Sequence, residues 1–584
     1  MHTSKVNRIY ASFIFMIGIA ALIPLIVIIR TDRQSLIVFI LRHLQRPYLS
    51  NILEQKMITA EKFSLLKRAC AALIGIDVVL MLLFYYFRNK AISFLHFIIN
   101  AVHSGFRSVI LVFRTSSKKE NFIFWIFMTI IILRGMYYIL ITDLQYDEMW
   151  CYNYYTSRPA YLTIFSYANY PLYELLTQIS TWLPFSAKIN LRLPVLFAGT
   201  LSCVIIYASS KKITGNFLTS LACMLLFVTM PATTQFMLYG KGTAVELFFA
   251  ITSFFCVVFF LKGVAYQKYL VLYVIANVWG LYSMPTHGYF WIMEFIFAGF
   301  YLLRYHIDLF KVFLLGNVMV LLIAFLCYLP MIVGSGTAYI TIPAWDHTDL
   351  SDPYASTGSL IKLINLYFTG NNYGLVIALS LAAVIVAAGK KSKKEYLFLL
   401  LFAGSLLILP LAIRFIQHIH IPERAVGFIG LSIPICTFFV FFLFKDVLAY
   451  SLRAGILVFL FVSMCLVSHF HPFRFWSAHL DKNTISVSNL LMQHHVTTCY
   501  DNAPSTKFFY YYPALEFYYG QQKKIFDLSV AAPNSFRYKP FSIKDNYDCV
   551  IADVSANDSA YANDYQIIYT DPEAGFNLMV KKGK

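Results

Sequence analysis

The sequence predicts a polytopic α-helical membrane protein with about 13 spans and a C-terminal extracytoplasmic α/β domain. Of the 584 residues, 59% are hydrophobic and 13% are charged, which is about half the charged fraction of soluble domains. The apolar residues form runs long enough to cross a bilayer. After residue 471 the apolar content falls, and Asn, Asp, Ser and Pro become frequent.

The formal net charge of +18 need not indicate nucleic acid, because Lys and Arg in short loops on one side of a membrane give the same total. We expect no nucleic-acid partner. If the span at 122–142 starts in the cytoplasm, alternation places these basic groups inside: Lys211-Lys212, Lys262 with Lys268, Arg304 with Lys311, Lys390-Lys391 with Lys393-Lys394, and Lys445 with Arg453. The long loops 143–192 and 334–373 then lie outside, as does everything after 471. This predicts a multi-pass protein of the plasma (inner) membrane.

Residues 1–120 form an N-terminal extension with two or three apolar segments. Spans are expected at 10–29 and 70–87, with a basic stretch between them. The segment 91–113 carries His103 and Arg107, so it is either a poor span or an amphipathic helix lying on the membrane. The charges do not settle the topology of this extension.

The transmembrane core covers 121–471 and contains most of the predicted spans. We place them at 122–142, 193–210, 214–232, 243–261, 269–285, 288–303, 312–333, 374–389, 396–413, 424–444 and 454–470.

The C-terminal domain, 472–584, is predicted to be mixed α/β. Its strand-like runs are Val496–Tyr500, Lys524–Phe526, Cys549–Val554 and Tyr565–Tyr569, and a helix is expected at Ala514–Tyr519. Cys499 and Cys549 are its cysteines; outside the cytoplasm they could form a disulfide, but the sequence cannot show the geometry and leaves free thiols open.

Polar residues at span ends gather on the predicted outer face. They are Asp147-Glu148, Arg192, Lys241, His287 and Arg424. Each alone could be an interfacial anchor, but their agreement in sidedness favours a functional cluster, since polar groups near membrane depth are costly. The outer loop 334–373, with Trp345 and Asp346, is either a lid over substrate or a packed surface loop.

These motifs resemble a known family, the GT-C membrane glycosyltransferases, specifically the superfamily of protein O-mannosyltransferases and aminoarabinose–lipid A transferases. The matching pieces come in the family's order: Asp147-Glu148, Asn169-Tyr170-Pro171-Leu172-Tyr173, Leu191-Arg192-Leu193-Pro194, Thr286-His287 and Arg424. The resemblance covers roughly 121–470. The His of the family's His-Pro-Pro motif is missing, Lys241 stands where many members have Arg, and 1–120 has no recognised counterpart.

The resemblance implies transfer of a sugar from a polyprenyl-phosphate donor to an acceptor hydroxyl, by an inverting displacement. Asp147 would be the base and Glu148 would orient the site or bind acceptor. Lys241, Arg192 and Arg424 would meet the leaving phosphate, and His287 would bind phosphate or sugar or else serve a structural role. Tyr170 and Tyr173, with Trp345 and Asp346, are candidate acceptor or loop residues.

No metal site is predicted, no cofactor is required, and a divalent cation is left open. A lipid, a polysaccharide and a protein hydroxyl remain open as acceptors, in a role in cell-envelope glycosylation, with membrane lipids as further partners. The rival functions are a polysaccharide polymerase or ligase and a transporter of lipid-linked glycans. Transport favours ionisable groups near mid-span and duplicated halves, whereas the charged residues here are expected at span ends.

Overall fold

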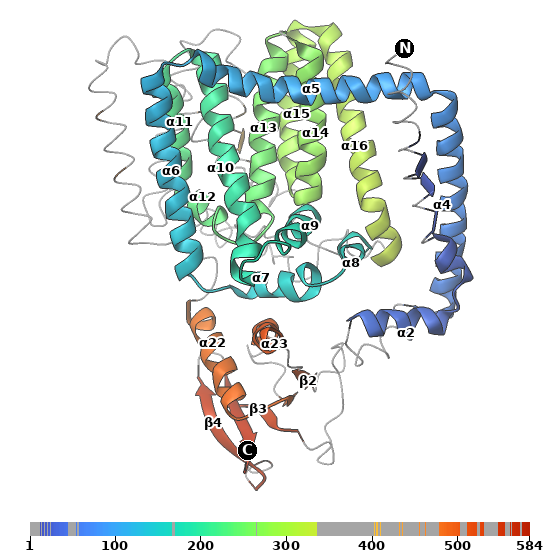
Figure 1. Cartoon of the computed structure of the whole chain (residues 1–584), viewed down its shortest axis with the longest axis vertical. Coiled ribbons are helices and arrows are strands. Elements are labelled where there is room, and N and C mark those ends of the chain that lie inside the picture. The colour runs from blue at the N-terminus through green and yellow to red at the C-terminus, as the bar shows by residue number, and fades with distance from the viewer. Residues whose placement is uncertain are drawn as a thin grey trace, which may run out of the picture. The chain divides into compact units, whose positions relative to one another are not determined.

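The computed structural model describes residues 25–44, 58–165, 170–263, 265–335, 478–502, 511–522, 526–530, 547–554, 563–572 and 575–583, with scattered single residues elsewhere. The chain divides into two compact units, residues 1–99 with 477–584, and residues 100–476. Figure 1 shows the helices and strands of both.

The described part of the second unit is helical. Its elements are the part of α5 (Arg88–Thr115) from Asn100 onward, α6 (Lys118–Ile141), α7 (Tyr146–Cys151), a π-helical turn (Tyr152–Thr156), α8 (Ala160–Phe165), α9 (Pro171–Ser180), α10 (Ala187–Thr214), α11 (Phe217–Thr229), α12 (Pro231–Phe236), α13 (Thr243–Leu261), α14 (Tyr266–Ser283), α15 (His287–Tyr305) and α16 (Ile307–Ser335).

Local sequence signals explain where several of these helices begin and end. Ser117 and Glu120 form a capping box at the start of α6, which satisfies backbone N–H groups that the helix leaves open. Asn216 accepts a hydrogen bond from the Thr219 backbone at the start of α11. Gly215 ends α10 with a φ of 67°, a left-handed conformation that glycine adopts readily.

Five described helical segments are long and apolar enough to cross a membrane: Ile92–Thr115, Lys118–Ile141, Ala187–Thr214, Thr243–Leu261 and Ile307–Ile332. These helices support a multi-pass membrane protein. α13 has the bounds predicted for the span 243–261, and α14 and α15 lie at the spans 269–285 and 288–303. The segments 374–389, 396–413, 424–444 and 454–470 lie outside the described residues, apart from scattered positions, so the count of about 13 spans stays a prediction.

The span predicted at 214–232 is divided in the structure. α11 ends at Thr229, and Pro231 begins the separate short helix α12. Proline has no backbone N–H and favours the first turn of a helix, which explains why the chain starts a new helix here.

α5 runs across the ends of neighbouring helices in the second unit (Figure 1). The Lys268 ammonium, at the start of α14, donates to Ser104 O at 2.8 Å. The Lys211 ammonium, at the end of α10, donates to Ser116 Oγ at 2.6 Å. Because one helix contacts the ends of two others, the contacts favour the amphipathic surface helix over the poor span as the interpretation of 91–113.

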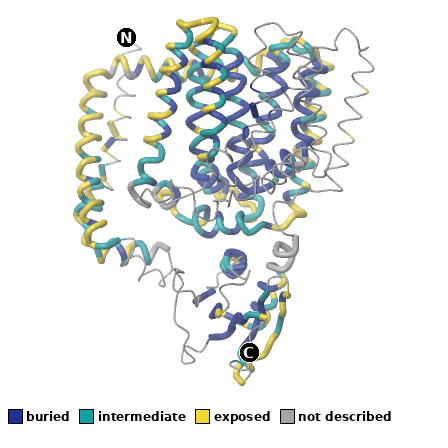
Figure 2. Tube along the Cα trace, turned by 180° about the vertical axis from the view of Figure 1, so that it is seen from behind, coloured by how far each residue is buried: buried dark blue, intermediate teal, exposed yellow. Residues whose placement is uncertain are grey.

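The core of the second unit forms around α10, α11 and α13, whose buried stretches are dark blue in Figure 2. Phe227, Ile251 and Val257 are among its fully buried side chains. α13 is the most buried of the candidate spans, with 72% of its most apolar 18 residues buried, whereas the corresponding share in α6 and α16 is 28%, so much of their surface is at least partly exposed. Such exposure suits helices whose outer faces contact lipid.

In the first unit, the described N-terminal elements are α2 (Arg33–Leu44) and α4 (Ala60–Tyr86), followed by the start of α5. The C-terminal part contains α22 (Ala478–Gln493), β1 (Thr498–Asp501), α23 (Tyr512–Gln521), β2 (Asp527–Val530), β3 (Cys549–Asp553), β4 (Tyr565–Asp571) and β5 (Phe576–Lys581).

The five strands form one mixed sheet in the order β2-β1-β3-β5-β4. β1 pairs in parallel with β2 and β3, and β5 is antiparallel to β3 and β4. Residues of α22 and α23, such as Leu491 and Leu515, join the sheet in one buried core. Four of the five strands lie at or beside predicted runs, while β5 and α22 were missed.

Candidate functional site

The acidic pair lies in the first turn of α7. The Glu148 carboxylate accepts a hydrogen bond from the Gln145 backbone N–H at 2.8 Å, as part of a capping box at the helix start. Carboxylates are stabilised near a helix N-terminus by the unpaired N–H groups there. The residues around the acidic pair thus orient Glu148 through local contacts.

Glu148 is fully buried and forms a bidentate ion pair with Arg192, near the start of α10. Arg192 Nε donates to Oε1 and Nη2 donates to Oε2, each at 2.7 Å. The rigid guanidinium fork matches the two carboxylate oxygens, which makes this one of the stronger charge-assisted contacts in proteins. Both side chains are buried, so removal of either one would leave the charge of the other without a partner.

The rest of the Arg192 guanidinium is bound to the end of α6. Nη1 donates to Thr142 O and to Thr142 Oγ1, both at 2.8 Å. Nη2 also donates to Asp143 O at 2.6 Å. Arg192 therefore ties together the end of α6, the start of α7 and α10, and its donors are largely used within the protein.

Asp147 faces a different set of partners. The Lys241 ammonium, in the turn between α12 and α13, donates to Asp147 Oδ2. The Tyr239 hydroxyl donates to the same oxygen at 3.1 Å. The Asp147 side chain keeps 15% of its surface exposed, whereas that of Lys241 keeps 3%. Asp147 is thus the more accessible carboxylate of the acidic pair.

Gly240 joins the two halves of this cluster. Its backbone N–H donates to Glu148 Oε1 at 2.7 Å, so Glu148 positions the turn that carries Lys241. A Cβ on Gly240 would lie 2.8 Å from Glu148 Oε1 and 2.8 Å from the Tyr173 hydroxyl. The close approach explains why a glycine occupies this position.

The tyrosines of the predicted loop motif lie beside the cluster. Tyr170 precedes α9, and the Lys241 ammonium lies 5.7 Å from its ring centre, within range of a cation–π contact. Tyr173 is fully buried, and its hydroxyl donates to Leu191 O at 2.9 Å. Tyr173 therefore anchors α9 against the start of α10.

His287 lies in a second buried polar network. Its Nδ1 is 3.1 Å from Glu246 Oε1, and its Nε2 is 3.0 Å from Asn277 Oδ1. Asn277 donates to Ser253 Oγ at 2.6 Å, and Ser253 in turn donates to Glu294. Both ring nitrogens of His287 thus contact protein groups, which favours a structural role over binding of phosphate or sugar.

Glu294 corrects one expectation. It lies in the middle of α15 and is fully buried, so the charged residues do not all cluster at span ends. The sequence reasoning overlooked it because a single acidic residue barely changes the apolar pattern of a span. Ser253 and Asn277 bind its Oε2, whereas its Oε1 has no hydrogen-bond partner among the described residues.

Glu174 is a buried carboxyl of another kind. It lies in the first turn of α9 with no exposed surface, and neither of its side-chain oxygens has a hydrogen-bond partner among the described residues. Burial raises the pKa of Glu174 well above its ordinary value, because a charged carboxylate is poorly solvated there.

The structure therefore brings together Asp147, Glu148, Arg192, Lys241 and Tyr170. Arg424, Trp345 and Asp346 lie outside the described residues, as does Asn169 of the loop motif. In the part of the chain that is described, no group of three or more His, Cys, Asp or Glu side chains is arranged to hold a metal ion.

Tyr239 and Gly240 are members of the site that sequence reasoning did not select. The available signal was their position beside Lys241, in a glycine-flanked turn just before a span. Glu246 and Asn277 had no comparable signal, because their partners are distant in sequence.

No protein-family model matches the chain, and no curated protein matches its sequence. Solved structures do match. The apo crystal structure of ArnT from Cupriavidus metallidurans has a TM-score of 0.53 at 11% identity, covering 79% of this chain and 98% of ArnT. The structure of the same protein bound to undecaprenyl phosphate has a TM-score of 0.52 at 10% identity, covering 80% of this chain and 99% of ArnT.

A further match is the archaeal oligosaccharyltransferase AglB from Archaeoglobus fulgidus, in complex with an inhibitory peptide and a dolichol-phosphate. It has a TM-score of 0.46 at 10% identity and covers 80% of this chain and 75% of AglB. The two ArnT matches extend over nearly the whole of ArnT, so the likeness concerns the architecture rather than one motif. The chain therefore has the GT-C fold of ArnT, which confirms at the level of fold the resemblance identified from the sequence.

Proposed function

We propose that this protein is a membrane glycosyltransferase that moves a sugar from a polyprenyl-phosphate donor to an acceptor hydroxyl on the extracytoplasmic side. The observation that carries the proposal is the contact of Asp147 with Lys241, beside the Glu148–Arg192 pair. The ArnT fold adds support, because one of the matching ArnT structures contains undecaprenyl phosphate.

Asp147 is better suited than Glu148 to act as the base. Both oxygens of Glu148 are occupied by Arg192 and by backbone N–H groups, and its side chain has no exposed surface. Asp147 retains exposed surface through which an acceptor hydroxyl could reach it. A general base must lie within hydrogen-bond reach of the proton it removes.

The reaction is then a single displacement. The acceptor O–H proton passes to Asp147 as the acceptor oxygen bonds to the anomeric carbon. The bond from that carbon to the phosphate oxygen breaks, and its electron pair leaves with the lipid phosphate. Attack opposite the leaving group inverts the anomeric centre.

Lys241 is the cation best placed to meet the leaving phosphate. Its ammonium lies beside the proposed base, and a positive charge there stabilises the negative charge that develops on the phosphate. In this proposal the phosphate competes with Asp147 for Lys241, so donor binding frees the carboxylate for its role as base. Arg192, by contrast, is a positioning residue, because its donors already bind Glu148 and the end of α6.

The test measures transfer of labelled sugar from polyprenyl-phosphate sugar by the full-length protein in proteoliposomes. We expect Asp147→Asn to lower the rate at least a hundredfold, the usual range for loss of a general base, while donor binding persists. Asp143→Asn is the matched control, because Asp143 is also in the outer loop but its side chain is 62% exposed. It should transfer at the wild-type rate.

Equal rates for Asp147→Asn and wild type would overturn the assignment of the base. Absence of transfer by wild type, across hexose and pentose donors and lipid, polysaccharide and peptide acceptors, would overturn the proposed reaction and return attention to the polymerase and transporter alternatives.

A further inference from the structure

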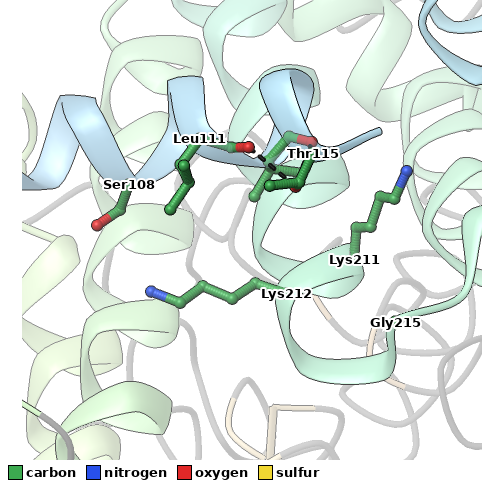
Figure 3. Close-up of a pocket in the computed structure, with 7 residues that line it drawn as sticks. Ser108, Leu111, Thr115, Lys211, Lys212 and Gly215 are labelled. Carbon is green, nitrogen blue, oxygen red and sulfur yellow. Dashed lines mark hydrogen bonds between the residues drawn. The ribbon is translucent and has the colours of Figure 1, made fainter. Parts of the chain in front are cut away.

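A pocket of about 350 Å³ lies beneath α5, at the C-terminal end of α10. Its lining residues are Ser108, Leu111, Val112, Thr115, Lys211, Lys212 and Gly215. Figure 3 shows the two lysines leaving the end of α10 in different directions, with Lys212 running beneath the α5 segment that carries Ser108 and Leu111. The α5 wall of the pocket therefore combines the apolar side chains of Leu111 and Val112 with the hydroxyls of Ser108 and Thr115, and the opposite wall is cationic.

This pocket lies a membrane thickness from the candidate site. Arg192, near the start of α10, holds Glu148, whereas Lys212 is near the end of the same helix. A rise of about 1.5 Å per residue separates the two positions by roughly 30 Å along the helix. The hydrocarbon core of a bilayer is also about 30 Å thick, so the two ends of α10 fit the two opposite interfaces.

The pocket carries more positive charge than the nearby carboxylate balances. Lys211 forms an ion pair with Glu120 at 2.8 Å. Lys212 donates to the Tyr269 hydroxyl, and Lys268 donates to Ser104 O and Ser108 Oγ, all neutral oxygens. Burial lowers the pKa of Lys268, and the charge of Lys212 lowers it further. Lys268 contacts the lining residue Ser108, and its charge and that of Lys212 repel each other. An anion bound between them would relieve that repulsion.

The α5 wall of the pocket is held in place by specific contacts. Lys268 donates hydrogen bonds to Ser104 and Ser108. Gly105 also packs closely against Leu272 of α14, since a Cβ on Gly105 would lie 3.0 Å from Leu272 Cδ1. α5 nevertheless exposes large apolar side chains, among them Phe106, Ile110 and Leu111. An amphipathic helix of this kind lies at a membrane interface with its apolar face among lipid chains.

We propose that this pocket binds the phosphate of an anionic phospholipid headgroup, which Lys212 and Lys268 hold while the acyl chains contact the apolar residues of α5. Basic pockets between membrane helices are suited to such headgroups. A soluble phosphate compound offers the same anion, but Leu111 and Val112 in the lining and the exposed apolar side chains of α5 favour a ligand that has acyl chains. The site is at the opposite end of α10 from Arg192, so the inference stands apart from the proposed catalytic function.

The test uses delipidated full-length protein titrated with phosphatidylglycerol, with bound lipids counted by native mass spectrometry. The double variant Lys212→Gln/Lys268→Gln should bind the first phosphatidylglycerol roughly tenfold or more weakly, as expected for loss of two cations at a bilayer surface. Lys311→Gln is the matched control, because Lys311 is a lysine of the predicted inside loops whose side chain is 75% exposed. It should bind phosphatidylglycerol as wild type does.

The charge-preserving variant Lys212→Arg/Lys268→Arg should retain binding. Retained binding would show that the Gln variant binds weakly because it lacks the two charges and not because the protein is misfolded. Equal weakening by Lys311→Gln would overturn the proposal, because binding would then follow net charge alone. Equally tight binding of phosphatidylcholine would also overturn it. Displacement of the first phosphatidylglycerol by millimolar glycerol phosphate would assign the site to a soluble phosphate and overturn the lipid as its ligand.

Discussion

Arg192 Nε and Nη2 bind the two carboxylate oxygens of Glu148, each at 2.7 Å, although the residues are 44 positions apart in the sequence. The pair is buried, and Gly240 N–H binds Glu148 Oε1 from a third element. One carboxylate thus fixes the positions of α7, α10 and the turn before α13. The two carboxylates of the acidic pair therefore differ in role: Glu148 holds the elements of the site together, and Asp147 is the one that substrate could reach.

The Glu148–Arg192 pair should contribute strongly to stability. Removal of one partner leaves a buried charge unpaired, so Arg192→Gln should destabilise the protein by about 3–5 kcal/mol. The double variant Glu148→Gln/Arg192→Gln should be less destabilised than the sum of the two single variants. Thermal unfolding in detergent measures this coupling, with Lys311→Gln, whose side chain is 75% exposed, as the control. Additive effects would show that the two side chains do not stabilise each other.

Gly240 should not tolerate a side chain. A Cβ would lie 2.8 Å from Glu148 Oε1 and from the Tyr173 hydroxyl, and Arg192 prevents the carboxylate from moving aside. Gly240→Ala should therefore cost about 1–3 kcal/mol, as overpacking does in a tight interior. The matched control is Gly299→Ala, where the nearest atom outside its own helix is at 3.6 Å. A Gly240→Ala protein with the melting temperature of wild type would contradict the close packing.

The sequence predicted the parts of the site that have local signals. Asp147-Glu148, Arg192 and Lys241 stand at span ends, where charge is rare enough to notice. The alternation of basic loops also supported their placement on one face. α13 was predicted with its observed bounds because its apolar run is uninterrupted and begins directly after the Gly-Lys-Gly turn.

Other parts depend on contacts that sequence spacing cannot reveal. Glu246, Asn277 and Glu294 meet across three helices, and no local pattern links them. α5 has the length and hydropathy of a span, so only its contacts with Lys211 and Lys268 show its crosswise position. The break at Pro231 was missed because the apolar run of α11 extends through Met230 and Ala232, the two residues beside the proline.

Cys499 and Cys549 should remain free thiols. They are opposite each other on the paired strands β1 and β3, both fully buried and both unbridged in the structure. Burial raises the pKa of Cys499 well above its ordinary value, so little reactive thiolate forms. Peptide mapping after maleimide labelling should find neither cysteine labelled in the native protein and both labelled in SDS without reductant. Labelling that needs reductant would indicate a disulfide, which neighbouring strands can accommodate.

Glu174 should make the stability of the protein depend on pH. Its pKa is raised in the folded state by burial, so between its ordinary value and the raised value the folded protein binds more protons than the unfolded chain. The stability contributed by the protonated form is therefore present at low pH and is lost as the pH rises above about 5.

Glu174→Gln keeps a neutral side chain of the same shape. Its melting temperature should fall less than that of wild type between about pH 5 and pH 8. The difference between the two melting temperatures should therefore change in favour of Glu174→Gln as the pH rises. Asp308→Asn removes a carboxylate that is 95% exposed and should leave the pH dependence of wild type unchanged. Parallel curves for wild type and Glu174→Gln would show that Glu174 is not held protonated in the folded protein.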